Sequence, residues 1–343
     1  MLTLRTIDAH AAGEPLRLIV DGFPTPRGRT MLEKREWVRR NADHVRRALM
    51  LEPRGHADMY GAIFTEPVSP GAHAGVLFMH NEGYSTMCGH GVVAVTTIAL
   101  ERELLVPGGD GATIVYDSPA GTIRARAQVR EYAEGGPGDH DARSVRVEHV
   151  AFVNVPSFVL LPGIAVQLPN RTIRADVAFG GAFYAIVDSE AVGLPIDLAH
   201  LPDLRRVGMD IKRAIEAQHT VAHPLEPGLK GIYGTIFTGP ADAAGADLRN
   251  VTIFADAEVD RSPCGTGTAA VMAVLDAMGL LLDGKPFVHE SLIGTTFTGR
   301  VSSRTQVGER AAIVPEIQGS AWITGEHVFY VEDDDPLKNG FRM

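Results

Sequence analysis

The two cysteines of this chain stand in near-copies of one short motif, and they are the only cysteines among its 343 residues. Cys88 begins the run Cys-Gly-His-Gly, and Cys264 begins the run Cys-Gly-Thr-Gly. Each run leads into an apolar segment that is expected to be helical. A cysteine at a helix start faces unpaired N–H groups and the positive end of the helix dipole. This setting favours the thiolate and can lower the pKa of a thiol from about 8.5 to roughly 3.5–7.5.

The residues that follow both cysteines are suited to binding an anion. Their N–H groups could hold a carboxylate, because helix N-termini bind anions and glycine allows close approach. The four residues concerned are Gly89, His90, Gly265 and Thr266. If both helix starts converge on one carboxylate, a sulfur lies on each face of the carbon beside it. With reacting atoms about 3–3.5 Å apart, the sulfurs would be on the order of 7 Å from each other.

This arrangement predicts a two-base racemase or epimerase. One thiolate removes the proton from Cα, and the opposite thiol returns a proton to the other face. The reaction needs neither a metal nor an organic cofactor, so we expect none.

Three other interpretations of the paired motif carry less weight. A free cysteine is often an inert buried side chain, but two matched motifs argue against that. A metal site would have at best Cys88, His90 and Cys264 as ligands, without a usual spacing. Gly265 to Ala270 matches a dinucleotide-binding fingerprint, but the stretch from Val259 to Cys264 is too long for the tight turn that this fingerprint requires.

Composition indicates an ordinary globular protein of about two domains, with 45% apolar and 22% charged residues. The net charge of −10 gives no reason to expect a nucleic acid or an anionic membrane as a partner. No apolar run is long enough for a transmembrane helix, and the first twenty residues lack the order of a secretory signal. Because two cysteines cannot form a disulfide framework, we expect a reducing cytoplasm.

Both halves of the chain follow the same order of elements. Strands, an amphipathic helix, further strands, a Cys-Gly loop, an apolar helix and more strands occur twice, which indicates an internal duplication. The apolar helices, predicted at 92–105 and 268–282, carry almost no charge and should be buried on most sides. Thr30 and Glu33 form a capping box at the start of the first amphipathic helix, whose arginines we expect on a solvated face. The sequence therefore predicts an α/β (α+β) protein with sheets around a central apolar helix in each half.

The two cysteine motifs resemble the signatures of the proline racemase family, which comprises proline racemases, 4-hydroxyproline 2-epimerases and trans-3-hydroxy-L-proline dehydratases. The similarity covers nearly the whole chain, and its quoted segments are Met87–His90, Asp260–Thr268, Glu52–His56, Gly180–Tyr184 and Asp333–Leu337. The resemblance implies a diaminopimelate-epimerase-like fold with the active site in a cleft between two halves. We place the first half at 1–140 plus 325–343 and the second at 141–324. The family also suggests a homodimer.

The resemblance also implies roles for individual residues. Cys88 and Cys264 become the acid–base pair, the four residues after them hold the carboxylate, and Asp260 receives the ring nitrogen. That last role is physically sound, because a secondary ammonium in a closed site needs a carboxylate partner. Without the resemblance, Asp260 could equally cap a turn. Tyr60 and Phe254 fall where the family has aromatic walls around the ring, although strand aromatics more commonly face a core.

Within the family, the sequence points in two directions. The body of the chain is most similar to the dehydratase branch, notably at Asp58–Gly61, His80–Ser85 and Ile232–Ile236. That branch typically has threonine where this chain has Cys264. Dehydration needs one base and loss of the 3-hydroxyl, whereas inversion needs a second acid–base group on the opposite face.

The sequence therefore predicts a racemase or epimerase of proline or hydroxyproline. The alternative is a trans-3-hydroxy-L-proline dehydratase that yields Δ1-pyrroline-2-carboxylate, or one protein with both activities. A protein that binds the amino acid without catalysis is the third hypothesis.

Overall fold

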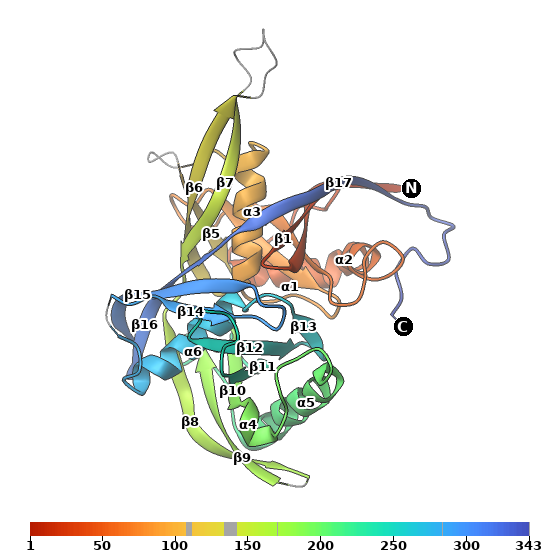
Figure 1. Cartoon of the computed structure of the whole chain (residues 1–343). Coiled ribbons are helices and arrows are strands. Elements are labelled where there is room, and N and C mark those ends of the chain that lie inside the picture. Colours follow the sequence, from red (N-terminus) through yellow and green to blue (C-terminus); the bar gives the residue numbers. More distant parts are fainter. Residues whose placement is uncertain (108–111, 134–142, 170, 283, 343) are drawn as a thin grey trace.

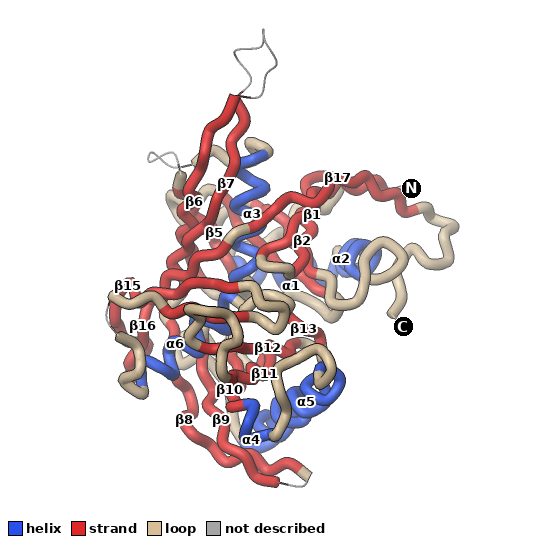
Figure 2. The backbone as a smooth tube through the Cα atoms, viewed as in Figure 1, coloured by secondary structure: helices blue, strands red, loops and turns tan. Residues whose placement is uncertain are grey.

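The structure, a computed structural model, describes residues 1–107, 112–133, 143–169, 171–282 and 284–342. The composition of residues 133–139, rich in glycine, predicts a flexible loop, and from residue 134 on this segment lies outside the described residues. Strands dominate the described chain, as the red tube in Figure 2 shows. No helix in these ranges combines the length and the apolar character needed to cross a membrane.

The bounds of the elements are as follows. The first seven strands are β1 (Leu2–Ala11), β2 (Glu14–Asp21), β3 (Tyr60–Thr65), β4 (Ala74–His80), β5 (Thr113–Ser118), β6 (Gly121–Ala133) and β7 (Arg143–Val153). The next are β8 (Ser157–Leu168), β9 (Arg171–Phe179), β10 (Phe183–Asp188), β11 (Ile232–Gly239), β12 (Leu248–Phe254), β13 (Glu258–Asp260), β14 (Phe287–Glu290), β15 (Thr296–Val307), β16 (Arg310–Gly319) and β17 (Ala321–Val331). The helices are α1 (Met31–Asn41), α2 (Asp43–Met50), α3 (Gly89–Glu101), α4 (Ser189–Val192), α5 (Leu201–Gln218) and α6 (Gly265–Ala277).

The strand pairings repeat in the two parts of the chain. β2 pairs in parallel with β3, which pairs antiparallel with β4, and β4 is parallel to β5. In the same way, β10 is parallel to β11, β11 is antiparallel to β12, and β12 is parallel to β14. A second sequence repeat accompanies this topology: β3 begins Tyr-Gly-Ala-Ile-Phe-Thr, and β11 contains Tyr-Gly-Thr-Ile-Phe-Thr. The duplication therefore extends well beyond the two cysteine motifs.

Each of the two apolar helices is surrounded by strands, as predicted. α3 contacts β1, β2, β6, β7 and β17, and α6 contacts β8, β9, β10, β15 and β16 (Figure 1). Every residue of α3 from Gly89 to Leu100 is buried, as are the residues of α6 from Gly265 to Val274. Both helices begin three residues earlier than predicted, because the cysteines themselves are the N-caps.

The first amphipathic region differs from the prediction in two ways. The capping box at Thr30 is confirmed, but the expected single helix is split at Ala42 into α1 and α2. Arg39 and Arg40 are exposed, as expected of a solvated face. Arg46, however, is buried, and its guanidinium donates to the carbonyl oxygens of His80 (2.8 Å) and Asn81. The prediction is wrong for Arg46, which instead holds the segment that leads to Cys88.

The end of the chain returns to its beginning. β17 pairs antiparallel with β1 from Leu2 to Ala11, and the N-terminal ammonium lies 2.8 Å from a carboxylate oxygen of Asp333. Figure 1 shows both termini on the same side of the molecule. The residue at which one half ends and the other begins stays a prediction.

Candidate active site

The N-termini of α3 and α6 abut each other. A Cβ atom added to Gly89 would lie 2.4 Å from Cα of Gly265, and one added to Gly265 would lie 2.5 Å from Cα of Gly89. Real Cβ atoms do not approach other atoms so closely, so both positions require glycine in this packing. The structure thus brings the two cysteine motifs together.

Each cysteine caps its own helix. The Sγ atom of Cys88 accepts a hydrogen bond from the N–H of Gly91 at 3.2 Å, and that of Cys264 accepts one from Gly267 at 3.3 Å. The N–H groups between them, on the first two residues of each helix, have no acceptor within a helix. Both cysteines are free and only 5% exposed. The arrangement is that of two buried thiols beside amide donors that have no acceptor among the residues that the structure describes.

The thiols are not activated in the way that the helix dipole alone predicts. Burial, and next the negative charge of Asp260, raises the pKa of both Cys88 and Cys264. The hydrogen bonds from the helix amides act in the opposite direction but are smaller effects. The expectation of a lowered thiol pKa is therefore wrong, because removing a thiolate from water costs more than the helix dipole returns.

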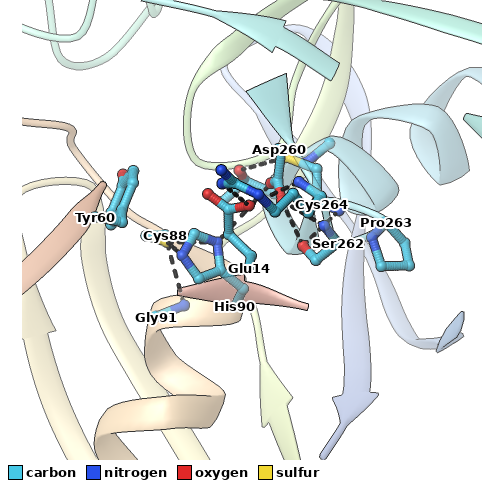
Figure 3. A network of polar contacts seen from close by, with 12 residues as sticks. Glu14, Tyr60, Cys88, His90, Gly91, Asp260, Ser262, Pro263 and Cys264 are labelled. Atoms are coloured by element: carbon cyan, nitrogen blue, oxygen red, sulfur yellow. Dashed lines mark hydrogen bonds and ion pairs between the residues drawn. The ribbon is translucent and has the colours of Figure 1, made fainter. Parts of the chain in front are cut away.

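An imidazole lies next to Cys88. Nδ1 of His90 is 3.2 Å from the Sγ of Cys88 and 3.9 Å from Oδ2 of Asp260 (Figure 3). Burial lowers the pKa of His90, which favours the neutral ring. Tyr60 packs edge-on against this imidazole, with ring centroids 4.8 Å apart. The sequence predicted only a main-chain role for His90, whereas its side chain also contacts the thiol.

Hydroxyl groups take the corresponding place beside Cys264. The phenol oxygen of Tyr184 lies 3.6 Å from the Sγ of Cys264 and 2.7 Å from Oγ1 of Thr266. Thr266 Oγ1 is itself 3.8 Å from this sulfur. The sequence analysis gave Tyr184 no role, because nothing in its strand pattern distinguishes it from a core aromatic. Its position after the Gly180-Gly181 pair was the available signal.

Asp260 lies at the end of β13 and organises the turn before Cys264. Its Oδ1 accepts hydrogen bonds from the N–H (2.9 Å) and the hydroxyl (2.7 Å) of Ser262, whose Oγ in turn accepts from the N–H of Cys264 (3.1 Å). Its Oδ2 faces His90 instead. Asp260 is thus both a turn-capping residue and a charge beside the two thiols, so the two interpretations that the sequence left open are compatible.

Glu14 is a second buried carboxyl group in this network, and the sequence analysis missed it. Its Oε2 accepts a hydrogen bond from the N–H of Arg261 at 2.7 Å, and Figure 3 shows it between His90 and Asp260. Burial, and next the charge of Asp260, raises the pKa of Glu14 well above its ordinary value. The pair therefore carries less negative charge than two ionised carboxylates would.

Aromatic side chains close one side of the site. Tyr60 and Phe254 are both buried, with ring centroids 6.1 Å apart, and Tyr233 stacks on Phe254 at 5.4 Å. The hydroxyl of Tyr60 lies 2.5 Å from Oγ of Ser85 and 3.2 Å from the hydroxyl of Tyr233. The last contact joins the two repeated Tyr-Gly strands. A cavity of about 490 Å³, lined in part by Ser85 and Tyr233, opens beside this hydroxyl cluster.

All nine residues that the sequence singled out therefore belong to one region. The residues that it missed are Glu14, Ser85, Tyr184, Tyr233 and Ser262. Together they form a small closed site with two thiols, unpaired amide donors, carboxyl groups and an aromatic side.

Comparisons with known proteins agree with this geometry. The family model described as "Proline racemase" matches residues 6–342. A trans-3-hydroxy-L-proline dehydratase of Bacillus thuringiensis subsp. konkukian is 48% identical over 98% of this chain and 97% of its own length. A 3-hydroxyproline 2-epimerase of Burkholderia multivorans is 43% identical over 99% of this chain and 98% of its own.

A solved structure extends the agreement to the fold. The hydroxyproline epimerase of Agrobacterium vitis, crystallised with trans-4-hydroxy-L-proline, superposes with a TM-score of 0.89 at 29% identity, covering 100% of this chain and 95% of that one. The predicted two-part α/β fold is confirmed. With a family model that spans almost the whole sequence and relatives above 40% identity, this chain is an enzyme of the proline racemase family.

Proposed function

We propose that this protein is a cofactor-independent racemase or epimerase that inverts Cα of proline or a hydroxyproline, with Cys88 and Cys264 as the acid–base pair. The observation that carries the proposal is the contact between Gly89 and Gly265, which presents one buried thiol from each of two facing helix starts. A dehydratase would need only one of these thiols.

The binding step follows from the charges of the site. The substrate carboxylate accepts hydrogen bonds from the unpaired N–H groups of Gly89, His90, Gly265 and Thr266. The ring ammonium pairs with Asp260. Because the charge of Asp260 helps to raise the pKa of both thiols, a bound ammonium would oppose this effect and make a thiolate more accessible. Substrate binding thereby supplies part of the activation that the unliganded site lacks.

The chemical step exchanges one proton for another. One sulfur, as thiolate, accepts the proton of Cα, and the carbanion receives a proton from the thiol on the opposite face. The sulfur that acted as base ends as a thiol and the opposite sulfur ends as a thiolate, so the reverse reaction starts from that state. Tyr60 and Phe254 exclude water from the ring side, which limits loss of the carbanion to solvent.

Dehydration of trans-3-hydroxy-L-proline is the second candidate function. It is favoured by the names of relatives at 44–48% identity. After loss of the Cα proton, departure of the 3-hydroxyl would give an enamine and then Δ1-pyrroline-2-carboxylate. Cys264 is not needed for this reaction, which is why inversion is proposed first.

Incubation in D2O separates these possibilities. The protein is mixed with L-proline, trans-4-hydroxy-L-proline or trans-3-hydroxy-L-proline, and the products are read by NMR. An epimerase gives deuterium at Cα together with the other stereoisomer, and a dehydratase gives the cyclic imine from the 3-hydroxy compound. Binding of the planar pyrrole-2-carboxylate without any deuterium exchange would contradict catalysis and leave a binding protein.

Two further properties belong to the same proposal. The two free cysteines support a reducing compartment such as the cytoplasm, because oxidation would remove both the acid and the base. The family resemblance supports a homodimer, which light scattering after gel filtration would test. Activity should also fall on treatment with thiol alkylating agents.

A further inference from the structure

We propose that His80 donates the proton that leaves with a ring hydroxyl, and that Glu258 is the positioning residue that makes this possible. The inference rests on dehydration, the second candidate function proposed above, and it requires a proline ring between Cys88 and Cys264. It adds a second acid to the site, on the side of the ring away from the carboxylate.

Glu258 is a buried carboxyl group without a hydrogen-bond partner. It is 1% exposed, and neither of its oxygens accepts a hydrogen bond from any residue that the structure describes. The cation-forming group in contact with it is His80, whose Nδ1 lies 3.3 Å from Oε2. Leaving a buried carboxyl unpaired is costly. Glu258 also shares a face of β13 with Asp260, because residues two apart on a strand point the same way.

Nδ1 of His80 faces a donor and an acceptor at once. The N–H of Glu82 donates to Nδ1 at 3.3 Å, and Oε2 of Glu258 lies 3.3 Å from the same nitrogen. A ring without a proton on Nδ1 accepts from Glu82, and a ring protonated at Nδ1 donates to Glu258. The cationic ring and the neutral ring that has lost its Nε2 proton therefore both direct Nδ1–H at Glu258, so the carboxyl group orients the ring before and after the proton transfer.

The other ring nitrogen is free for a ligand. Nε2 of His80 has no hydrogen-bond partner within the described ranges, and His80 lines the cavity of about 490 Å³. Its ring lies against the aromatic side of the site, 5.7 Å from Tyr60, 5.8 Å from Phe254 and 6.0 Å from Tyr233 between centroids. A carboxyl group on one nitrogen and open space on the other is the arrangement that orients an imidazole for proton transfer.

The elimination step then balances. The Cys88 thiolate takes the Cα proton, the electron pair forms the Cα–C3 double bond, and the C3–O bond breaks. The proton of His80 Nε2 joins the departing hydroxyl, which leaves as water. His80, now neutral with its remaining proton on Nδ1, stays directed at Glu258 until solvent returns a proton to Nε2. No oxidant or reductant is needed.

The test measures how trans-3-hydroxy-L-proline divides between elimination of water and exchange of its Cα hydrogen. Trans-3-hydroxy-L-proline is incubated in D2O with the protein and with the variants Glu258→Gln and His80→Asn. NMR measures the rate of imine formation and the rate of deuterium entry at Cα of recovered substrate. General acid catalysis contributes about 10²- to 10⁴-fold, so the ratio of elimination to exchange should fall at least about 100-fold in His80→Asn. In Glu258→Gln it should fall about tenfold or more.

Glu326→Gln is the matched control, because Glu326 is exposed, pairs with Arg102 and does not line the cavity. Its ratio should stay within about twofold of the unmodified protein. A purely structural role of Glu258 or His80 would lower both rates together and keep the ratio constant, which would overturn the inference. So would exchange without elimination in the unmodified protein. Absence of exchange with every substrate, proline included, would instead contradict the proposed function itself.

Discussion

The starts of α3 and α6 have the same backbone plan but different chemical surroundings. In both, a cysteine caps the helix, the amide three residues on donates to its sulfur, and the next residue is a glycine that touches the other motif. The residue after that differs: His90 brings an imidazole to Cys88, whereas Thr266 brings a hydroxyl to Cys264. The two helix starts therefore share one backbone arrangement, and they differ in the side chain two residues after the cysteine.

The backbone at the caps diverges as well. Cys88 has an extended conformation with φ −143°, but Cys264 has φ +61°, which L-residues adopt only at a cost. The strained cap is held by Asp260 and Ser262 before it and by Tyr184 beside it. Cys88 thus has a neighbour that can carry a proton, whereas Cys264 is held in place by neutral donors. We therefore expect Cys88 to be required for every reaction, and Cys264 for inversion alone.

Replacing Cys88 should have the largest effect. Cys88→Ser removes the base, so inversion and any dehydration should both fall by about 10³-fold, within the range typical of a lost general base. Initial rates by NMR in D2O measure this. Cys264→Ser is the matched comparison, since it makes the same change at the other helix start. If Cys88→Ser keeps substantial activity in either reaction, the assignment of the base is wrong.

Replacing Cys264 should separate the two reactions. Cys264→Thr removes the second acid, so formation of the other stereoisomer should stop, while elimination from trans-3-hydroxy-L-proline and deuterium exchange with retention continue. Chiral chromatography of the products together with NMR measures both. Equal loss of inversion and elimination would show that the two thiols are not divided in this way.

Removing the hydroxyl group of Tyr184 beside Cys264 should have a smaller effect. A hydrogen bond to a charged group contributes about 1.5–3 kcal/mol, so Tyr184→Phe should slow inversion by about tenfold to a hundredfold. Exchange that depends on Cys88 should fall much less. Tyr116→Phe removes another buried tyrosine hydroxyl, one that contacts Thr96 rather than the thiols, and it should stay within about twofold. A similar loss in both variants would indicate a general packing effect.

How far the sequence predicts this molecule depends on whether a pattern is local. The capping box at Thr30, the buried apolar helices and the pairing of the two cysteine motifs all follow from spacing along the chain. The sequence predicts that Gly89 and Gly265 allow close approach of a ligand, and their contact with each other is an additional finding of the structure.

The features that the sequence does not predict depend on contacts between segments far apart in the chain. Glu14 and Tyr184 reach the site from strands far from either cysteine motif, and only the Gly180-Gly181 pair before Tyr184 marks one of them locally. The raised thiol pKa is of the same kind, because it results from burial by the whole fold rather than from the helix start. Arg46 was misassigned for this reason too: on its own helix it looks solvated, but the segment around His80 covers it.

The smallest effect concerns His289, which packs against the first turn of α6. His289 is fully buried, with Thr268 Oγ1 at 2.8 Å from Nδ1 and the amide of Asn250 donating to Nε2 at 2.9 Å. Burial lowers the pKa of His289 to about 3. The unfolded chain, with an ordinary histidine pKa of about 6.5, therefore binds a proton that the folded protein does not. The stability that His289 contributes is complete above about pH 6.5 and is lost as the pH falls toward 3, by about 1.4 kcal/mol per pH unit.

His289→Gln should remove this dependence, so that between pH 6.5 and pH 5 the variant loses about 2 kcal/mol less free energy of unfolding than the unmodified protein. Urea titrations at the two pH values measure the difference. His44→Gln, which changes an exposed histidine of α2, should show the full dependence. Because His289 contacts the first turn of α6, amide hydrogen exchange at pH 5 should rise there before it rises at the start of α3. Equal rises at both helices would mean that His289 does not specifically stabilise the start of α6.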